Sequence, residues 1–240
     1  YLFLSHLFTR FLPWGSPAAR ANASAAVCAS GAAGMLFLAV EASTGSEVAG
    51  MFSAGMFAFG RLVWSYAIQS EVFALNNLFA ATLFYLAVRY DGCPSDRTAY
   101  LGAFFCGLAL TNQHTIVFYV FPITLYVLAK GGAPLLTPPK VGKLTASVLA
   151  GMLPYGIIAW RSSARLPGSW GDLTNLSGFL THLLRREYGT FRLFAGAERG
   201  DHRFLYGLQR YCENFLEDSR YVGGGFALLG ILLVAARSGR

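Results

Sequence analysis

The sequence predicts an all-α, polytopic membrane protein, with a bundle of about seven membrane helices and one larger loop outside the membrane. The first observation is composition: 55% of the 240 residues are hydrophobic and only 13% are charged, whereas soluble domains carry about 25% charged residues. The second is a series of charge-poor runs, most of them long enough to cross a hydrocarbon core of about 30 Å as helices. One such run could be a buried core helix, but their repetition favours a membrane protein.

The expected organisation follows these runs. We expect residues 1–20 to form an outer amphipathic segment, residues 21–160 the transmembrane bundle and residues 161–220 the larger outer loop. The spans are expected at about 21–40, 48–68, 72–89, 98–111, 115–129, 144–160 and 221–236.

The run from 98 to 129 predicts a hairpin. As one helix it would extend about 48 Å, too far for a single span. Its middle is the polar sequence TNQHT, residues 111–115. Two short helices place this junction just below the membrane surface, where polar groups are tolerated if protein or a wet cavity surrounds them.

Basic residues in the short loops predict the orientation, because cytoplasmic loops carry an excess of Lys and Arg. When the 41–47 turn is placed on the cytoplasmic side, the short segments on that side are the more basic ones. Residues 69–77 and TNQHT then both lie on the opposite, outer side of the membrane. The inner basic residues are Arg89, Arg97, Lys130, Lys140, Lys143, Arg237 and Arg240.

Several functional classes lose support from the sequence. The net charge is +7, but no basic stripe with interleaved aromatic residues accompanies it, so we predict no nucleic-acid partner. The chain has no nucleotide-binding loop, HExxH, CxxC pair or GxSxG motif. ATP-driven transport and hydrolase chemistry are therefore disfavoured, and no metal site is predicted.

The first candidate residues are Glu71, Asn76 and Asn77, at the head of an apolar run. Ser70 can cap the helix that follows, and the dipole of that helix can stabilise the Glu71 carboxylate in the first turn. This explanation of Glu71 requires no functional role. Arg61 interrupts the preceding run. It either extends toward the membrane surface or faces the bundle interior, where it could bind an anionic ligand.

The second candidates are Asn112, Gln113 and His114 of TNQHT. These side chains could simply cap two short helices. Alternatively, they line a recessed polar pocket in which helix ends favour an anion.

The outer loop carries a third set of candidates. They are Trp170, Asp172, Arg185, Glu187 and Tyr188. Surface ion pairs and an interfacial aromatic belt would explain them, but aromatic faces and Arg side chains also suit a sugar phosphate. Two segments match the glycosylation sequon, and we favour Asn175 over Asn22, which lies too close to the membrane.

Five segments resemble the GT-C glycosyltransferases, and among them the transmembrane protein O-mannosyltransferases that modify IPT domains of plexins and Met-type receptors. No segment is specific alone, but their joint occurrence is. They are FGRLVWSYAIQSEVFALNNLF (59–79), GLALTNQHTIVFYV (107–120), GMLPY (151–155), WGDLTNLSGFLTH (170–182) and LRREYGTF (184–191).

The resemblance implies a GT-C-like bundle in the endoplasmic reticulum membrane, with the larger loop in the lumen. It implies transfer of mannose from dolichyl phosphate mannose to Ser or Thr of folded extracellular domains, without a metal or a further cofactor. Relatives place an acidic base before a HPPGYP-like motif. Tyr1 falls on the end of that motif, so we expect the catalytic acid to lie before Tyr1 and this fragment to be inactive alone.

Donor- and substrate-binding roles then fall to residues of all three sets. These are Arg61, Glu71, Asn76, Asn77, Asn112, Gln113, His114, Trp170, Asp172, Arg185, Glu187 and Tyr188. The alternative function is a multi-span transporter or a lipid-binding scaffold without catalysis, because intramembrane polar groups and short helices suit a carrier too. A transporter of that kind is expected to show an inverted repeat, and the sequence shows none.

Overall fold

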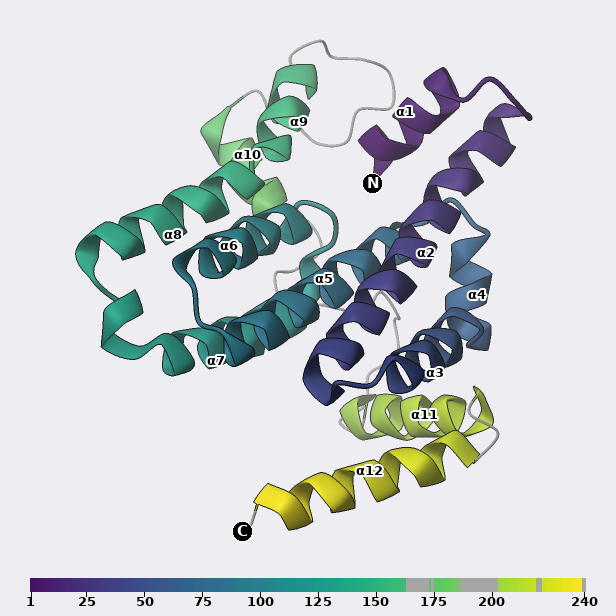
Figure 1. Cartoon of the computed structure of the whole chain (residues 1–240). Helices are drawn as coiled ribbons and strands as arrows, with labels where there is room; N and C mark the ends of the chain where they lie inside the picture. Colours follow the sequence, from purple (N-terminus) through teal and green to yellow (C-terminus); the bar gives the residue numbers. More distant parts are fainter. Residues whose placement is uncertain (163–172, 174, 185, 187–202, 219–221, 239–240) are drawn as a thin grey trace.

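The computed structural model describes all residues except 163–172, 174, 185, 187–202, 219–221 and 239–240. The described residues form helices joined by short turns (Figure 1). The helices are α1 (Leu2–Phe11), α2 (Pro17–Thr44), α3 (Glu47–Ala58), α4 (Arg61–Ala67), α5 (Val72–Gly92), α6 (Asp96–Leu110), the 3-10 turn η1 (His114–Ile116), α7 (Val117–Leu135), α8 (Pro138–Gly151), α9 (Pro154–Ser162), α10 (Leu176–Leu183), α11 (Arg203–Asp218) and α12 (Val222–Ser238).

Local chemistry sets several helix boundaries. The hydroxyls of Ser16, Ser46 and Ser95 each accept a backbone N–H three residues on, at 3.2 Å, and so cap α2, α3 and α6. Gly45 ends α2 in the left-handed region, with φ of 69°, a conformation that costs glycine little. A glycine followed by a serine cap therefore makes the tight α2–α3 turn.

Helix α5 lies at the centre of the bundle and contacts α2, α4, α6 and α7. Against α2 it buries small side chains, including Ala25, Ala29 and Ala74. Small residues let two helices approach closely, which is the usual basis of helix association in a membrane. On its other side, Phe79 and Leu83 pack with side chains of α6, η1 and α7.

The structure corrects two of the expected spans. Residues 48–68 are not one helix, because α3 and α4 meet at an angle of 69° around Phe59 and Gly60. Residues 144–160 are likewise divided into α8 and α9, bent by 45°. Pro154 begins α9. Since proline has no backbone N–H to donate to α8, the helix cannot continue unbroken through it.

Three described helices are long and apolar enough to cross a membrane, or up to five if each bent pair counts as one span. They are α2, α5 and the stretch His114–Leu135, which the sequence placed at 21–40, 72–89 and 115–129. The last of these extends further than expected. The polytopic helical class is confirmed, while the count of about seven spans stays a prediction.

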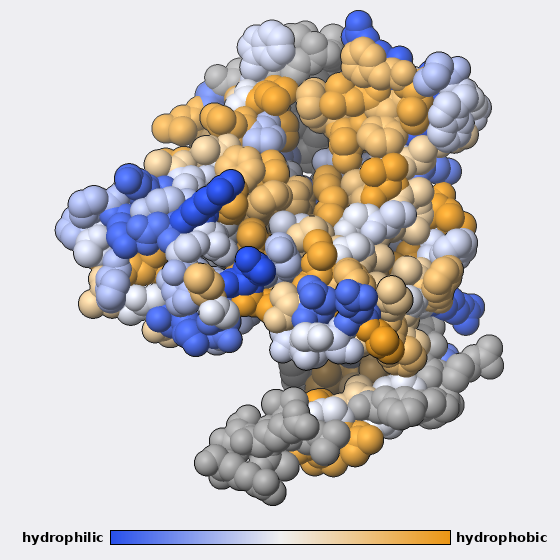
Figure 2. All heavy atoms as spheres, in the orientation of Figure 1, coloured by the Kyte–Doolittle hydropathy of each residue, from blue (hydrophilic) through white to orange (hydrophobic). Residues whose placement is uncertain are grey.

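The surface distribution fits this class (Figure 2). Hydrophobic side chains cover much of the visible face over α1 and α2, and hydrophilic ones gather where α7 turns into α8. Helices α11 and α12 lie beyond the α2–α3 turn at the lower end of the bundle (Figure 1). The topology predicted for residues 161–220, outside the membrane on the face of TNQHT, stays a prediction.

Helices α6 and α8 approach each other backbone to backbone. A Cβ atom built on Gly107 would overlap the carbonyl oxygen of Val148, and one built on Gly151 would overlap the carbonyl oxygen of Phe104. Neither obstacle is a flexible side chain. Glycine is therefore required at both positions for the two helices to lie as close as they do.

We predict that Gly107→Ala and Gly151→Ala each destabilise the chain, by about 1–3 kcal/mol or more, because the backbones of α6 and α8 must separate. Thermal unfolding in detergent, followed through a thiol-reactive dye on the buried Cys28 and Cys106, measures this. The matched controls are Gly102→Ala and Gly142→Ala in the same helices, where a Cβ meets nothing within 4 Å. Equal unfolding temperatures for the two pairs would contradict the prediction.

Candidate functional site

The TNQHT junction lies directly against the start of α5. The side-chain Nδ2 of Asn112 donates a hydrogen bond to the carbonyl oxygen of Val72 at 3.1 Å. Val72 follows Glu71, and Asn76 is one turn further along the same helix face. The structure thus brings together two polar segments that the sequence placed on one face of the membrane.

Helices α9 and α10 close the other side of the junction. The hydroxyl of Tyr155 donates to the carbonyl oxygen of Leu110 at 3.1 Å and lies 3.5 Å from Nε2 of His114. The same imidazole nitrogen is 2.9 Å from the carbonyl oxygen of Leu183, at the end of α10. Because a carbonyl only accepts, Nε2 carries the proton in that contact.

Three amide oxygens at this junction are buried and accept no hydrogen bond from the described residues. They are Oδ1 of Asn76, Oδ1 of Asn112 and Oε1 of Gln113. The bond of Asn112 to Val72 orients its amide, so its oxygen points away from that carbonyl. A buried acceptor without a donor costs about 1–3 kcal/mol. Such a cluster therefore suits a ligand or water that supplies several O–H donors.

Glu71 differs from its expected place. We expected Ser70 to cap α5 and Glu71 to lie in the first turn, but Glu71 is itself the N-cap residue and its carboxylate makes no capping bond. The Ser70 hydroxyl instead lies 2.6 Å from the hydroxyl of Tyr1, which is 3.5 Å from that of Ser24. The Glu71 side chain is exposed beside the junction.

Arg61 stands apart from the other candidates. It is the first residue of α4, at the corner after Gly60, and its side chain is exposed. The chain from Arg61 to Glu71 is not one helix, because α4 ends at Ala67 and α5 begins at Val72. Among the described residues, no hydrogen bond or ion pair joins Arg61 to another candidate. Asn77 is half-buried on α5.

The outer-loop candidates cannot be compared with the structure. Trp170, Asp172, Arg185, Glu187 and Tyr188 all lie outside the described residues. The proposed glycosylation site is described: Asn175 is exposed and caps α10, its Oδ1 accepting the N–H of Gly178 at 2.7 Å. Its modification stays a prediction.

Sequence analysis missed Tyr155 and Tyr1 as members of this region. Tyr155 is buried, and its ring meets that of Phe179 edge-on at 6.2 Å, which joins α9 to α10. A tyrosine after a proline in an apolar run was the available signal, because a buried phenol needs a hydrogen-bond partner. Nothing in the sequence pattern predicted that Tyr1 would contact Ser70.

The junction offers several hydrogen-bonding groups to a polar molecule. In the described part of the chain, no three His, Cys, Asp or Glu side chains lie close enough to hold a metal ion. The groups that do converge are amide oxygens, one imidazole, one phenol and an exposed carboxylate. This set offers both acceptors and donors to a ligand with many hydroxyls, such as a sugar.

Comparison with known proteins adds independent information. Residues 1–133 match the family model described as the protein O-mannosyl-transferase TMEM260 N-terminal domain. The chain is 41% identical to protein O-mannosyl-transferase TMEM260 of Mus musculus, over 80% of its length and 28% of that protein. It is 33% identical to the tmem260 protein O-mannosyl-transferase of Dictyostelium discoideum, over 97% of its length and 30% of that protein. No solved structure matches. The chain thus spans about three-tenths of the curated relatives it matches.

The unpartnered oxygens predict opposite effects for two similar substitutions. Asn76→Leu is expected to leave the free energy of unfolding unchanged or to raise it, because it removes a buried acceptor that finds no donor in the described part of the chain. Asn112→Leu is expected to lower it by about 0.5–1.5 kcal/mol, because the bond to Val72 is lost. Thermal unfolding of the ligand-free chain in detergent measures both. A larger loss for Asn76→Leu than for Asn112→Leu would show that the Asn76 amide is structural.

Proposed function

The chain belongs to the TMEM260 family of protein O-mannosyl-transferases, and from this premise we propose that it forms the donor-binding part of a membrane mannosyltransferase. The proposed donor is dolichyl phosphate mannose, and the proposed acceptor is a Ser or Thr hydroxyl of a folded extracellular domain. The reaction takes place at the luminal face of the endoplasmic reticulum membrane. The names of the relatives favour this function over a transporter or a lipid-binding scaffold.

The observation that carries the proposal is the set of unpartnered oxygens on Asn76, Asn112 and Gln113. A mannosyl group presents several hydroxyl donors, and each oxygen can accept one. The TNQHT sequence predicts a pocket in which helix ends favour an anion. Its free oxygens suit the sugar better, because a phosphate oxygen at pH 7 also only accepts hydrogen bonds. A site built to bind hydroxyls also discriminates against ligands that lack them.

The transfer needs two further functions. A base takes the proton of the acceptor hydroxyl as that oxygen bonds to the anomeric carbon of mannose. The bond from that carbon to the phosphate oxygen breaks, and dolichyl phosphate leaves with the electron pair. Because negative charge grows on the leaving phosphate, fixed cations or N–H donors near the membrane surface stabilise the transition state.

We assign residues to these functions as follows. For the phosphate we propose His114 at the junction and Arg185, which lies outside the described residues; Arg61 stands apart from the junction and receives no role. Glu71 and Asn77 bind sugar hydroxyls or orient the catalytic base, which this proposal does not assign to a residue of the chain. Asp172 and Glu187, with the rings of Trp170 and Tyr188, contact the sugar or the acceptor.

Donor binding tests the assignment of the amide oxygens. We expect the chain in nanodiscs to bind dolichyl phosphate mannose more tightly than dolichyl phosphate or dolichyl phosphate glucose. Asn76→Leu and Gln113→Leu should each weaken binding of the mannose donor about three- to tenfold. This is the change in affinity that corresponds to the loss of one neutral hydrogen bond. Binding of dolichyl phosphate, which has no sugar, should not change. Competition against a photoactivatable donor analogue measures all three affinities, and equal affinity for the three lipids would refute the assignment.

Transfer activity tests the roles of Glu71 and His114. This chain replaces the matching segment of the mouse relative, and the chimera is expressed in cells that lack the endogenous enzyme. Glu71→Ala and His114→Ala are expected to reduce mannosylation of a co-expressed IPT domain about tenfold or more. A loss of this size is expected because each variant removes a group that we expect to act on the transition state. Glu47→Ala, at the opposite end of the bundle, is the control. Unchanged transfer in both variants would remove Glu71 and His114 from the site.

A further inference from the structure

An apolar cavity lies away from the polar junction. It has a volume of about 300 Å³ and is enclosed by α5, α6, α7 and α8. Its lining includes Leu83, Leu86, Cys106, Ile123 and Leu144. Leu136 and Val141, which also line it, are 51% and 41% exposed. The cavity therefore opens to the surface where α7 turns into α8.

Packed side chains separate this cavity from the proposed donor site. Along α5 the order is Asn76, Phe79, Leu83 and then Tyr90, which lines the far end of the cavity. Phe79 packs with Ala109 of α6 and Ile116 of η1 in one buried cluster. This cluster lies between the amide oxygens and the cavity, so the cavity is a distinct feature at the other end of the bundle.

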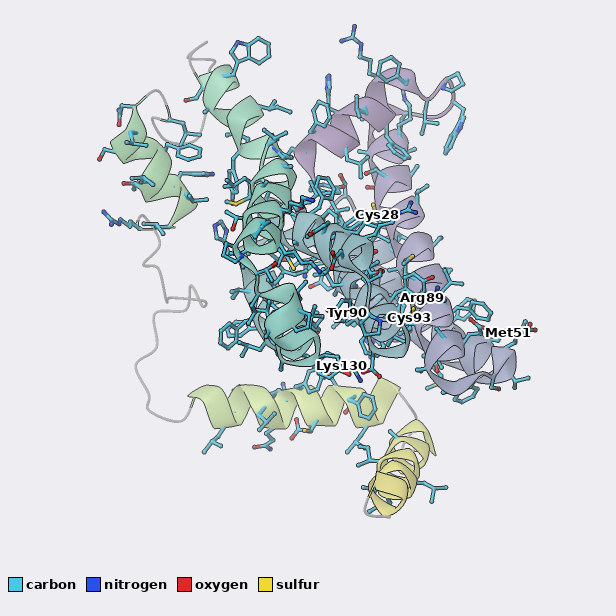
Figure 3. All side chains as sticks on the ribbon, turned by 60° about the vertical axis from the view of Figure 1, so that its left-hand side comes forward. Cys28, Met51, Arg89, Tyr90, Cys93 and Lys130 are labelled. Atoms are coloured by element: carbon cyan, nitrogen blue, oxygen red, sulfur yellow. The ribbon has the colours of Figure 1, made fainter. Side chains whose placement is uncertain are left out.

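Basic residues surround the open end. Figure 3 shows Arg89, Tyr90 and Lys130 together at the lower end of the bundle. The ammonium of Lys130 pairs with Asp91 at 2.7 Å, and that of Lys140 pairs with Asp96 at 2.7 Å. These two pairs join α7 to α5 and α8 to α6.

The rim keeps an excess of positive charge after these pairings. Arg89, Arg97 and Lys143 are exposed at the same end, and no described carboxylate lies within 4.0 Å of their charged groups. Each paired ammonium also has three N–H donors, more than one carboxylate oxygen uses. The rim therefore attracts an anion directly beside the opening of an apolar cavity.

We propose that this cavity binds one acyl chain of an anionic phospholipid, whose headgroup phosphate lies at the basic rim. An apolar cavity stays dry, and even about 150 Å³ suffices to bind a hydrocarbon such as benzene. Lipid chains are the apolar ligand that a membrane supplies. Clusters of Lys and Arg at the cytoplasmic surface attract anionic headgroups, and the sequence predicts this end to be cytoplasmic. The site is independent of mannosyl transfer and of the amide cluster.

Spin-labelled lipids test the proposal on the full chain in nanodiscs. Phosphatidylserine with a labelled acyl chain is expected to show a motion-restricted component, larger than that of phosphatidylcholine with the same label. Gly102→Leu should abolish the component. Gly102 lines the cavity, and a Cβ built there meets no atom within 4 Å, so the leucine side chain starts in open space and extends into the cavity. Gly55→Leu in α3, with equal room, is the control.

The rim is tested separately, with variants that lie on the surface and so do not depend on how the core tolerates leucine. Arg97→Gln and Lys143→Gln should each reduce the preference for phosphatidylserine over phosphatidylcholine about fivefold. Arg10→Gln, an exposed arginine of α1, should not. Equal restriction of both lipids, or a component that survives Gly102→Leu, would overturn the proposal. Displacement of the labelled phosphatidylserine by dolichyl phosphate would overturn it too, because the cavity would then hold a polyprenyl chain.

Discussion

The structure depends on how the end of α6 satisfies its backbone carbonyls inside an apolar bundle. The last carbonyls of a helix have no partner within it, and lipid cannot supply one. Here Leu108 accepts from the hydroxyl of Thr111, and Leu110 accepts from the phenol of Tyr155. The carbonyl of Val72 receives the amide of Asn112. These bonds let two helix ends meet in one place, and they position the amide oxygens that we assign to the sugar.

The candidate site combines two opposing requirements. Its side-chain donors stabilise the helix ends, and its amide acceptors have no partner among the residues that the structure describes. An empty site of this kind is less stable than a filled one, because a ligand that supplies donors removes the cost of the buried oxygens. The apolar clusters around Phe79 and Ala74 hold the junction in place without taking part in it.

The helical class and the polar interruption between two helices could be predicted from the sequence, because charge-poor runs and a polar interruption are local signals. The direct contact of Asn112 with Val72 was not predicted, only that the two polar segments share one face of the membrane. The corner at Gly60 and the bend at Pro154 were not predicted, since neither a glycine nor a proline alone distinguishes a kink from a break. Ser70 was assigned as a cap from its residue type, but a hydroxyl can also bond elsewhere, and here it contacts Tyr1. Tyr155 was missed because its partner is more than forty positions away.

The two glycines between α6 and α8 have a mechanical consequence. With the backbones in contact at Gly107 and Gly151, no side chain lies between α6 and α8 there that could absorb a small shift by changing its rotamer. A change in the separation of the two helices at this level must therefore be taken up by the backbone itself. Because Gly107 lies one turn before TNQHT, such a change acts directly on the amide junction.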